Sequence, residues 1–209
     1  MYIDNFIRMK KRGFFIVFEG IDGSGKSIHI KYLSQELKKR GYRIVITKEP
    51  SKGQVGNFLH SYVRQQQKRL LPKTEALLFT ADRFEHVKKI IAPALKVGKI
   101  VISDRYYHSS FAYQGASGVT LEWIQELNQF APKPDLCILL DILPDYSLHR
   151  ANRKRTVFED ADFLRKVREI YRQYALKGEL IQIDADKPRK AVQEEVFSLV
   201  NELLDGVED

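Results

Sequence analysis

One eight-residue segment has the residue types and spacing that phosphate chemistry requires. It reads Gly20-Ile21-Asp22-Gly23-Ser24-Gly25-Lys26-Ser27 and follows an apolar stretch that ends at Glu19. Glycines let a backbone curl closely around an anion, so that successive N–H groups and the positive end of the following helix point at a polyphosphate. Lys26 then reaches the β and γ phosphates, and the Ser27 hydroxyl ligates Mg²⁺. The segment predicts a nucleoside triphosphate site with Lys26 as a catalytic residue.

Charged residues also follow two other apolar stretches of strand length. Lys48 and Glu49 come after one of them, and Asp104 and Arg105 come after another. Ligands of open α/β sheets bind beyond the carboxyl ends of the strands. A carboxylate suits Mg²⁺, whereas arginine holds phosphate oxygens with two parallel donors. We therefore expect Asp104 to lie with Ser27 at a metal ion, and Arg105 to bind a phosphate.

A third candidate pair lies within a predicted helix. Phe79 and Arg83 are four residues apart, so they share one helical face. An aromatic plane beside a long donor can stack on a nucleobase while the donor bonds the base edge, and such stacking contributes about 1–3 kcal/mol. Taken alone, a phenylalanine at position 79 would more often belong to the core, so both interpretations stay open at this point.

Short apolar segments alternate with longer helical patterns, and together they must position these residues. Segments of strand length without polar alternation are typical of strands that are covered on both faces. Alternation of strands with helices indicates βαβ units and a parallel sheet. The pattern predicts a three-layer α/β fold with a five-stranded parallel sheet flanked by helices. The predicted strands are Phe14–Glu19, Arg43–Lys48, Lys99–Asp104, Leu136–Asp141 and Leu180–Asp184.

The helical pattern predicts eight helices between and after these strands, and Pro93 should end or kink the third. No repeat and no linker interrupts the chain, so we expect a single domain over residues 1–209, with a flexible leader at about 1–12. The predicted helices are Lys26–Arg40, Gly53–Gln66, Pro72–Val97, Tyr106–Tyr113, Leu121–Phe130, Asp145–Arg155, Ala161–Lys177 and Arg189–Leu204.

The composition and the apolar runs limit which cellular compartment and which kinds of binding partner we expect. The longest apolar runs, Phe14–Phe18 and Leu136–Leu140, are far shorter than the roughly 18 residues of a membrane helix. The one cysteine, Cys137, lies in the second run, where a thiol usually packs as a small hydrophobe. The first residues lack the apolar stretch of a signal peptide, so we expect a cytoplasmic protein. The net charge of +8 admits an anionic partner.

In order along the chain, the motifs resemble those of the thymidylate kinase family. They are Phe18–Ser27, Lys48-Glu49-Pro50, Leu78–Arg83, Asp104-Arg105-Tyr106 and Ala112-Tyr113-Gln114-Gly115, and the similarity covers most of residues 14–200. The resemblance implies a P-loop NTPase fold and a homodimer. It also implies a nucleoside monophosphate kinase that uses Mg²⁺ and transfers the γ-phosphoryl group of ATP to dTMP, giving dTDP and ADP. Neither nucleic acid nor a membrane is implied as a partner.

The resemblance also implies roles for individual residues around dTMP. Phe79 resembles the residue that stacks on thymine, and Arg83 the residue that bonds its exocyclic oxygen. Tyr113 resembles the ring that packs against the deoxyribose, where a 2′-hydroxyl would be crowded. Asp22 resembles the partner of the 3′-hydroxyl, and Arg105 the clamp on the acceptor phosphate, which makes it a catalytic residue beside Asp104. The remaining residues expected to contact dTMP are Lys48, Glu49, Ser110 and Gln114.

A basic cluster follows the fourth predicted strand, where this family has its lid, here at about residues 144–160. The phosphate loop carries no basic residue from Ile21 to Ser24, so charge on the transferring phosphoryl group must be met from elsewhere. We expect Arg153 to be the principal catalytic cation, and Arg150 and Arg155 to contact ATP. A solvated basic face is the alternative.

At the position of Lys48, members of this family often carry arginine. Lysine supplies a single point of positive charge, whereas arginine offers two parallel donors, so a two-point contact with phosphate is not expected from Lys48.

Two other functions remain open from the sequence. Another P-loop nucleoside or nucleotide kinase, such as a deoxynucleoside kinase, shares the phosphate loop. A basic nucleic-acid-binding ATPase fits the net charge, but residues 184–209 hold eight acids against three bases, which argues against it. Phosphoryl transfer needs alignment and charge neutralisation without a covalent nucleophile. We therefore assign no catalytic Ser, Cys or His.

Overall fold

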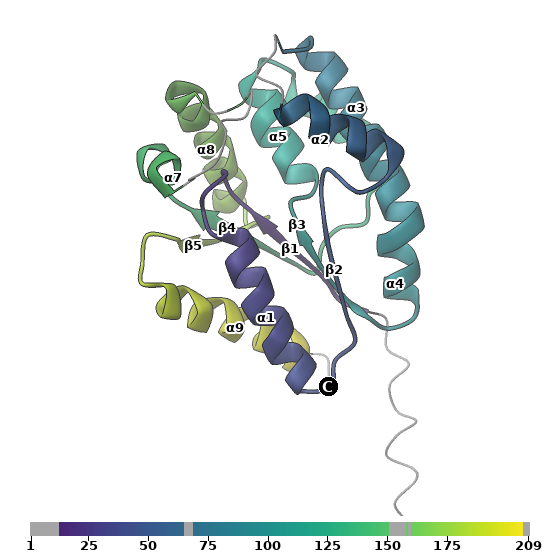
Figure 1. Ribbon diagram of the computed structural model, residues 1–209, viewed down its shortest axis with the longest axis vertical. Helices are drawn as coiled ribbons and strands as arrows, with labels where there is room; N and C mark the ends of the chain where they lie inside the picture. The colour runs from purple at the N-terminus through teal and green to yellow at the C-terminus, as the bar shows by residue number, and fades with distance from the viewer. Residues whose placement is uncertain (1–12, 65–68, 151–157, 159, 207–209) are drawn as a thin grey trace, which may run out of the picture.

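Five parallel strands form one sheet in the order β2-β3-β1-β4-β5 (Figure 1). The computed structural model describes residues 13–64, 69–150, 158 and 160–206. The strands are β1 (Phe15–Glu19), β2 (Ile44–Lys48), β3 (Ile100–Asp104), β4 (Leu136–Asp141) and β5 (Ile181–Asp184). The predicted fold class and all five predicted strands are confirmed, with bounds that differ by at most one residue.

Burial explains why these segments form strands in this order. Every residue of β1 and β4 is buried, because each strand has a neighbour on both sides and helices on both faces. The outer strands β2 and β5 consist of half-buried and exposed residues, apart from the buried Ile183. Cys137 is buried in β4 with 6% of its surface exposed, which confirms its predicted core position.

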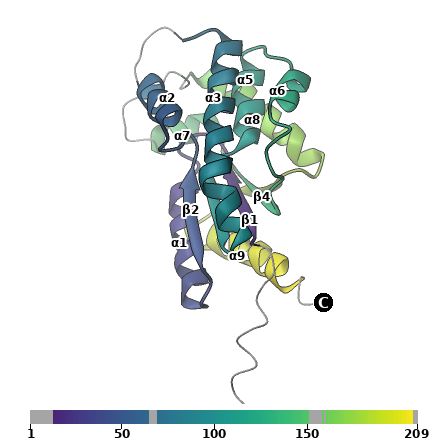
Figure 2. The ribbon, with the colours of Figure 1, turned by 90° about the vertical axis from the view of Figure 1, so that its right-hand side faces the viewer.

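Helices cover both faces of the sheet and complete three layers. Helices α1 and α9 pack together on one face, whereas α4, α5 and α8 lie on the other (Figures 1 and 2). Helix α2 packs on α3, α6 on α5, and α7 on α8. The helices are α1 (Lys26–Lys39), α2 (Gln54–Arg64), α3 (Pro72–His86), α4 (Ala92–Lys96), α5 (Tyr107–Ala116), α6 (Leu121–Leu127), α7 (Pro144–Arg150), α8 (Ala161–Leu176) and α9 (Arg189–Asp205).

The predicted helix Pro72–Val97 is interrupted just before Pro93, where the sequence predicts an end or a kink. A π-helical segment, Val87–Ile91, separates α3 from α4, and Pro93 lies in the first turn of α4. Proline has no N–H to donate, and its ring would clash with the carbonyl four residues earlier in a regular helix. The wider turn directly before Pro93 accommodates this change, so the chain continues in helical form instead of stopping.

Other predicted helix bounds need correction or lie outside the description. Helix α5 starts one residue later and ends three residues later than predicted, and α6 ends at Leu127 instead of Phe130. The predicted helix Asp145–Arg155 is observed as α7 up to Arg150. The predicted leader and most of the predicted lid beyond α7 fall outside the described residues. Within the described part of the chain, no helix is long and apolar enough to cross a membrane.

The sheet order creates a crevice at the carboxyl ends of its central strands. β1 lies between β3 and β4, and the chain leaves β1 towards α1 on one face but leaves β3 towards α5 on the other. Such a divergence of connections is where open α/β sheets bind ligands. The phosphate loop after β1 and the Asp104-Arg105 pair after β3 therefore face the same space.

Candidate active site

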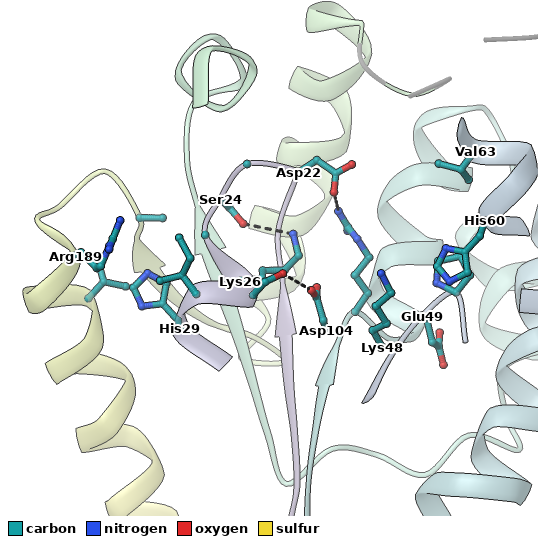
Figure 3. Close-up of a pocket in the computed structure, with 18 of the residues that line it drawn as sticks. Asp22, Ser24, Lys26, His29, Lys48, Glu49, His60, Val63, Asp104 and Arg189 are labelled. Carbon is teal, nitrogen blue, oxygen red and sulfur yellow. Dashed lines mark hydrogen bonds and ion pairs between the residues drawn. The ribbon is translucent and has the colours of Figure 1, made fainter. Parts of the chain in front are cut away.

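The phosphate loop is closed around the ammonium group of its own lysine. Lys26 Nζ donates hydrogen bonds to the carbonyl oxygens of Gly20 at 2.9 Å and Ile21 at 3.0 Å, and it lies 3.5 Å from Ser24 Oγ (Figure 3). Burial, and next the positive charge of Arg105, lower the pKa of Lys26 to about 8. Lys26 Nζ therefore lies where the anionic oxygens of a polyphosphate could replace these carbonyl oxygens as its hydrogen-bond acceptors.

Two glycines of this loop occupy positions that no other residue type fits. Gly20 has φ +134°, and a Cβ atom there would lie 2.5 Å from the Leu140 carbonyl oxygen. Gly23 has φ +83°, and its Cβ would lie 2.5 Å from the Ser147 carbonyl oxygen. At both positions the positive φ is unfavourable for other residues, and a neighbouring backbone carbonyl leaves no room for a Cβ atom, so the loop needs glycine there.

Ser27 and Asp104 come together across the crevice. Ser27 Oγ, at the start of α1, donates to Asp104 Oδ2, at the end of β3, over 3.1 Å. A hydroxyl and a carboxylate beside the phosphate loop are the oxygen ligands that Mg²⁺ prefers together with phosphate oxygens. The donor set therefore fits a magnesium ion, as the sequence predicts.

Arg105 links the phosphate loop to a second cavity. Its guanidinium donates to Asp22 Oδ1 at 2.8 Å and Ser109 Oγ at 3.0 Å, and it lies beneath the Tyr113 ring, 5.1 Å from the centroid. Arg105 has φ +75°, which among the described residues is the one positive φ outside glycine. Its N–H donates to the Phe18 carbonyl, so the strand neighbour holds this unfavourable conformation in place.

The buried carboxylate of Glu19 organises the surroundings of Arg105. Its side chain accepts hydrogen bonds from the N–H of Tyr106 at 2.8 Å, the hydroxyl of Ser109 at 2.6 Å and the hydroxyl of Tyr171 at 2.9 Å. Ser109 and Tyr171 in turn contact Arg105. Sequence reasoning noted Glu19 only as the end of a strand, although a charged residue at a buried strand end is itself a signal.

The second cavity opens beside Arg105, between α3, α5 and the loop after β2. All residues predicted to contact dTMP line it except Lys48. Lys48 is exposed and lines the larger phosphate-loop cleft, where it pairs with Asp104 in the sheet register. The cavity lining consists of Asp22, Glu49, Pro50, Val63, Phe79, Arg83, Arg105, Ser109, Ser110, Tyr113, Gln114 and Phe158.

Arg83 is held rigidly at the inner end of this cavity. Only 1% of its surface is exposed, and Nε donates to Glu49 Oε2 at 2.8 Å. The two terminal nitrogens donate to Asn128 Oδ1 at 2.6 Å and to Ser110 Oγ at 3.0 Å. His86 lies against the other carboxylate oxygen of Glu49, with Nδ1 at 3.1 Å. The guanidinium plane therefore has one fixed orientation towards any molecule in the cavity.

The sequence profile of the family described as "Thymidylate kinase" matches residues 18–196. The chain is 40% identical over 204 residues to "Probable thymidylate kinase" of Pyrococcus abyssi, covering 94% of this chain and all of the relative. It is 45% identical over 202 residues to the protein of the same description from Thermococcus onnurineus, covering 91% and 98%. The chain belongs to the thymidylate kinase family.

The motifs that carry the resemblance to thymidylate kinases surround one continuous cleft of about 860 Å³ and its side cavity. The cleft extends past the phosphate loop to residues that sequence reasoning missed (Figure 3). They are His29, Ala185, Lys187, Arg189 and Val192. Lys187 and Arg189 follow the carboxyl end of β5, so the rule applied to the other strand ends would have found them.

The motifs shared with thymidylate kinases did not predict His86 and Asn128, which contact the cavity residues Glu49 and Arg83. His86 comes three residues after Arg83, and this spacing was available as a signal for a shared helical face. Asn128 follows α6 and belongs to no motif, so only the folded chain brings it to Arg83. Of the predicted lid arginines, Arg153 and Arg155 lie outside the described residues, and the side chain of Arg150 does too.

Proposed function

We propose that the two cavities bind ATP and dTMP side by side, and that the γ-phosphoryl group passes between them, giving dTDP and ADP. Membership of the thymidylate kinase family makes the chain an ATP-dependent nucleoside monophosphate kinase. The single observation that supports the site most strongly is the Asp22–Arg105 ion pair at 2.8 Å. Both residues line both cavities, which supports a meeting of the donor and acceptor phosphates beside this pair.

On the donor side, we assign the triphosphate to the loop Gly20–Ser27. Backbone N–H groups surround the phosphates, and the Lys26 ammonium exchanges the carbonyl oxygens of Gly20 and Ile21 for phosphate oxygens. This exchange replaces neutral acceptors by charged ones, which strengthens the hydrogen bonds. Arg153 is proposed as the cation that meets the transferring phosphoryl group, with Arg150 and Arg155 on ATP.

On the acceptor side, Phe79 stacks on the thymine ring and Arg83 bonds its edge. The rigid orientation of Arg83 between Glu49 and Asn128 supports a role in selecting one base edge. Tyr113 forms the wall that crowds a 2′-hydroxyl, and Arg105 binds the acceptor phosphate. The other proposed contacts are Asp22 with the 3′-hydroxyl, Lys48 near the phosphates, and Glu49, Ser110 and Gln114 around the base.

Ser27 and Asp104 are proposed as the residues that hold Mg²⁺. The ion, when bound with ATP, neutralises phosphate charge. The protein's own contribution is alignment: Lys26, Arg105 and the loop N–H groups hold donor and acceptor so that their phosphates are adjacent. The acceptor phosphate is already an anion near neutral pH, because its second pKa is about 6. No strong general base is required, so we propose no catalytic Ser, Cys or His.

The family assignment does not favour the alternative of a deoxynucleoside kinase. We further propose a homodimeric cytoplasmic enzyme whose chain forms one nucleotide kinase domain, without nucleic acid or membrane partners. Half-exposed apolar side chains on neighbouring α2 and α3, namely Phe58, Leu77 and Phe84, support a protein partner at that surface. Light scattering on the purified protein tests the dimer, and a monomeric mass would contradict it.

Comparative single-turnover assays test the acceptor assignment. The acceptors are dTMP, dUMP, dCMP, dGMP, the ribonucleotide of thymine, and thymidine itself. We expect dTMP to react with the highest kcat/KM, and thymidine to be inert because it lacks the phosphate that Arg105 binds. A preference for a purine nucleotide or for the nucleoside would overturn the assignment. Lys26→Ala serves as the control that separates this activity from a contaminating kinase, because it should remove turnover while leaving dTMP binding largely intact.

A further inference from the structure

Arg69, which lies outside every motif, is held in one orientation by a buried carboxylate. It precedes α3, and its Nε and Nη2 donate to the two oxygens of Glu75 at 3.0 and 2.6 Å. Nη2 also donates to Ser117 Oγ at 2.8 Å. Glu75 is fully buried and also contacts the Tyr62 hydroxyl. This two-point contact fixes the plane of the guanidinium and not only its position.

The fixed guanidinium faces two aromatic rings from a distant part of the chain. Its central carbon lies 4.6 Å from the centroid of the Phe158 ring and 4.9 Å from that of Phe163, in α8. The two rings are stacked with an interplanar angle of 21°. A guanidinium within about 6 Å of a ring centroid attracts the ring electrostatically, and this attraction is larger where water is excluded. Arg69 therefore holds Phe158 from outside the cavity.

Phe158 also lines the second cavity, which we call the acceptor cavity because the proposed function assigns dTMP to it. It is 7% exposed, lines the cavity beside Phe79, and meets the Tyr113 ring edge-to-face with centroids 5.4 Å apart. The contacts thus run without a gap from Glu75 through Arg69 and Phe158 to Tyr113. Tyr113 is the ring to which the proposed function assigns the exclusion of a 2′-hydroxyl.

We propose that Arg69 is a positioning residue that fixes Phe158 against Tyr113, so that the two rings form a rigid wall on the sugar side of the acceptor nucleotide. The inference rests on the proposed function, because the wall selects only if the cavity holds a nucleoside monophosphate. Excluding one hydroxyl requires a wall that does not yield by a fraction of an ångström. Because the Tyr113 ring meets the Phe158 ring edge-to-face, it cannot shift towards Phe158 unless Phe158 also leaves its contact with Arg69.

Arg69→Met tests this role, because methionine keeps an unbranched apolar stem but removes the fork and the charge. The readouts are kcat/KM for dTMP and for the ribonucleotide of thymine, and KM for ATP. We expect discrimination against the ribonucleotide to fall about fivefold or more, with KM for ATP unchanged. Arg69→Lys, which keeps a cation over Phe158, should retain part of the discrimination. Unchanged discrimination in an active Arg69→Met enzyme would overturn the proposal.

The chain offers a matched control on the opposite side of the sheet. The Arg40 guanidinium lies 4.4 Å from the centroid of the Phe197 ring and donates to Asn201 at 2.9 Å, between α1 and α9. Arg40→Met loses the same kind of contact away from the acceptor cavity. It should leave the sugar discrimination unchanged even if it lowers the melting temperature. An equal loss of discrimination in both variants would contradict a specific role for Arg69.

Phe158→Leu covers the case in which Arg69→Met does not fold. Leucine still fills the space over Tyr113 but lacks the flat ring that Arg69 holds, so the same fall in discrimination is expected. If Phe158→Leu folds and keeps the wild-type ratio, the proposal is wrong. A wild-type enzyme that does not phosphorylate dTMP would instead contradict the proposed function. A wild type that phosphorylates dTMP, with variants that discriminate as it does, would contradict the role of Arg69 alone.

Discussion

The Glu49 carboxylate accepts a 2.8 Å hydrogen bond from Nε of Arg83, and both side chains are almost completely buried. His86 contacts the second oxygen of the same carboxylate. Glu49 comes from the loop after β2, whereas Arg83 and His86 come from α3. The ion pair therefore joins two segments that both line the acceptor cavity, and it sets the direction in which Arg83 points.

Glu49→Gln should impair both folding stability and dTMP binding. Glutamine keeps the shape but removes the negative charge, which leaves the buried Arg83 without its counter-ion. Breaking a buried pair in this way costs about 3–5 kcal/mol of unfolding free energy, read from urea denaturation. KM for dTMP should rise much more than KM for ATP. Glu36→Gln, which breaks an exposed pair with Lys39, is the control and should change neither quantity. Similar destabilisation by both substitutions would contradict this account of Glu49.

Phe79→Ala should weaken dTMP binding far more than ATP binding. Base stacking on an aromatic side chain contributes about 1–3 kcal/mol, which corresponds to a rise in the dTMP dissociation constant of about 5- to 150-fold. Phe197→Ala, on α9, likewise removes a partly buried ring that packs on the core, but this ring lies outside the acceptor cavity. Calorimetric titration of both variants with dTMP and with a non-hydrolysable ATP analogue provides the comparison. Equal losses for dTMP and the ATP analogue would return Phe79 to a core role.

The pKa of Lys26 predicts a loss of activity at alkaline pH. Burial, with the charge of Arg105, lowers this pKa to about 8, so the free enzyme loses the ammonium charge as the pH rises through that value. kcat/KM for ATP reports the free enzyme and should fall about tenfold per pH unit above pH 8. Bound phosphate restores the charged form, so kcat should fall only at higher pH. In the Lys26→Arg variant the side chain keeps its charge, so the fall of kcat/KM for ATP above pH 8 should disappear. A profile of kcat/KM for ATP that stays flat to pH 9.5 would be incompatible with this assignment.

The backbone at Arg105 predicts an unusual order of stability between two inactive variants. At φ +75°, a Cβ atom costs about 1–2 kcal/mol, which Arg105→Gly avoids and Arg105→Ala does not. After subtracting the larger chain entropy of unfolded glycine, the glycine variant should be more stable by roughly 0.5–1 kcal/mol. At the exposed helical position Lys31, alanine should instead be the more stable of the two. Urea midpoints measure both pairs, and the same order at both positions would refute the argument.

The sequence predicted those parts of the fold and site that local residue types determine. The apolar runs of β1 and β4 predicted buried strands because each run had to be covered on both faces. The glycines and Lys26 defined the phosphate loop because backbone curvature and charge are local properties. Phe79 and Arg83 were found because helical spacing places them on one face.

Other parts of the site depend on contacts between distant segments and left no local pattern. Asn128 accepts a hydrogen bond from Arg83, which is 45 residues away in the sequence. Glu19 accepts one from the Tyr171 hydroxyl, which is 152 residues away. Pro93 predicted an irregularity in the third helix, but the residue types of Val87–Ile91 are compatible with an ordinary helix, so its π-helical form was not predicted.

The Asp22–Arg105 pair has a consequence for how the two nucleotides affect each other. If Arg105 turns to the acceptor phosphate, Asp22 in the donor loop loses that contact, and a triphosphate that reshapes the loop likewise alters the hold on Arg105. Each nucleotide thereby changes the affinity for the other, and thermodynamic reciprocity requires the two factors to be equal. Occupancy of one nucleotide site can thus be sensed at the other through a single guanidinium that lines both cavities.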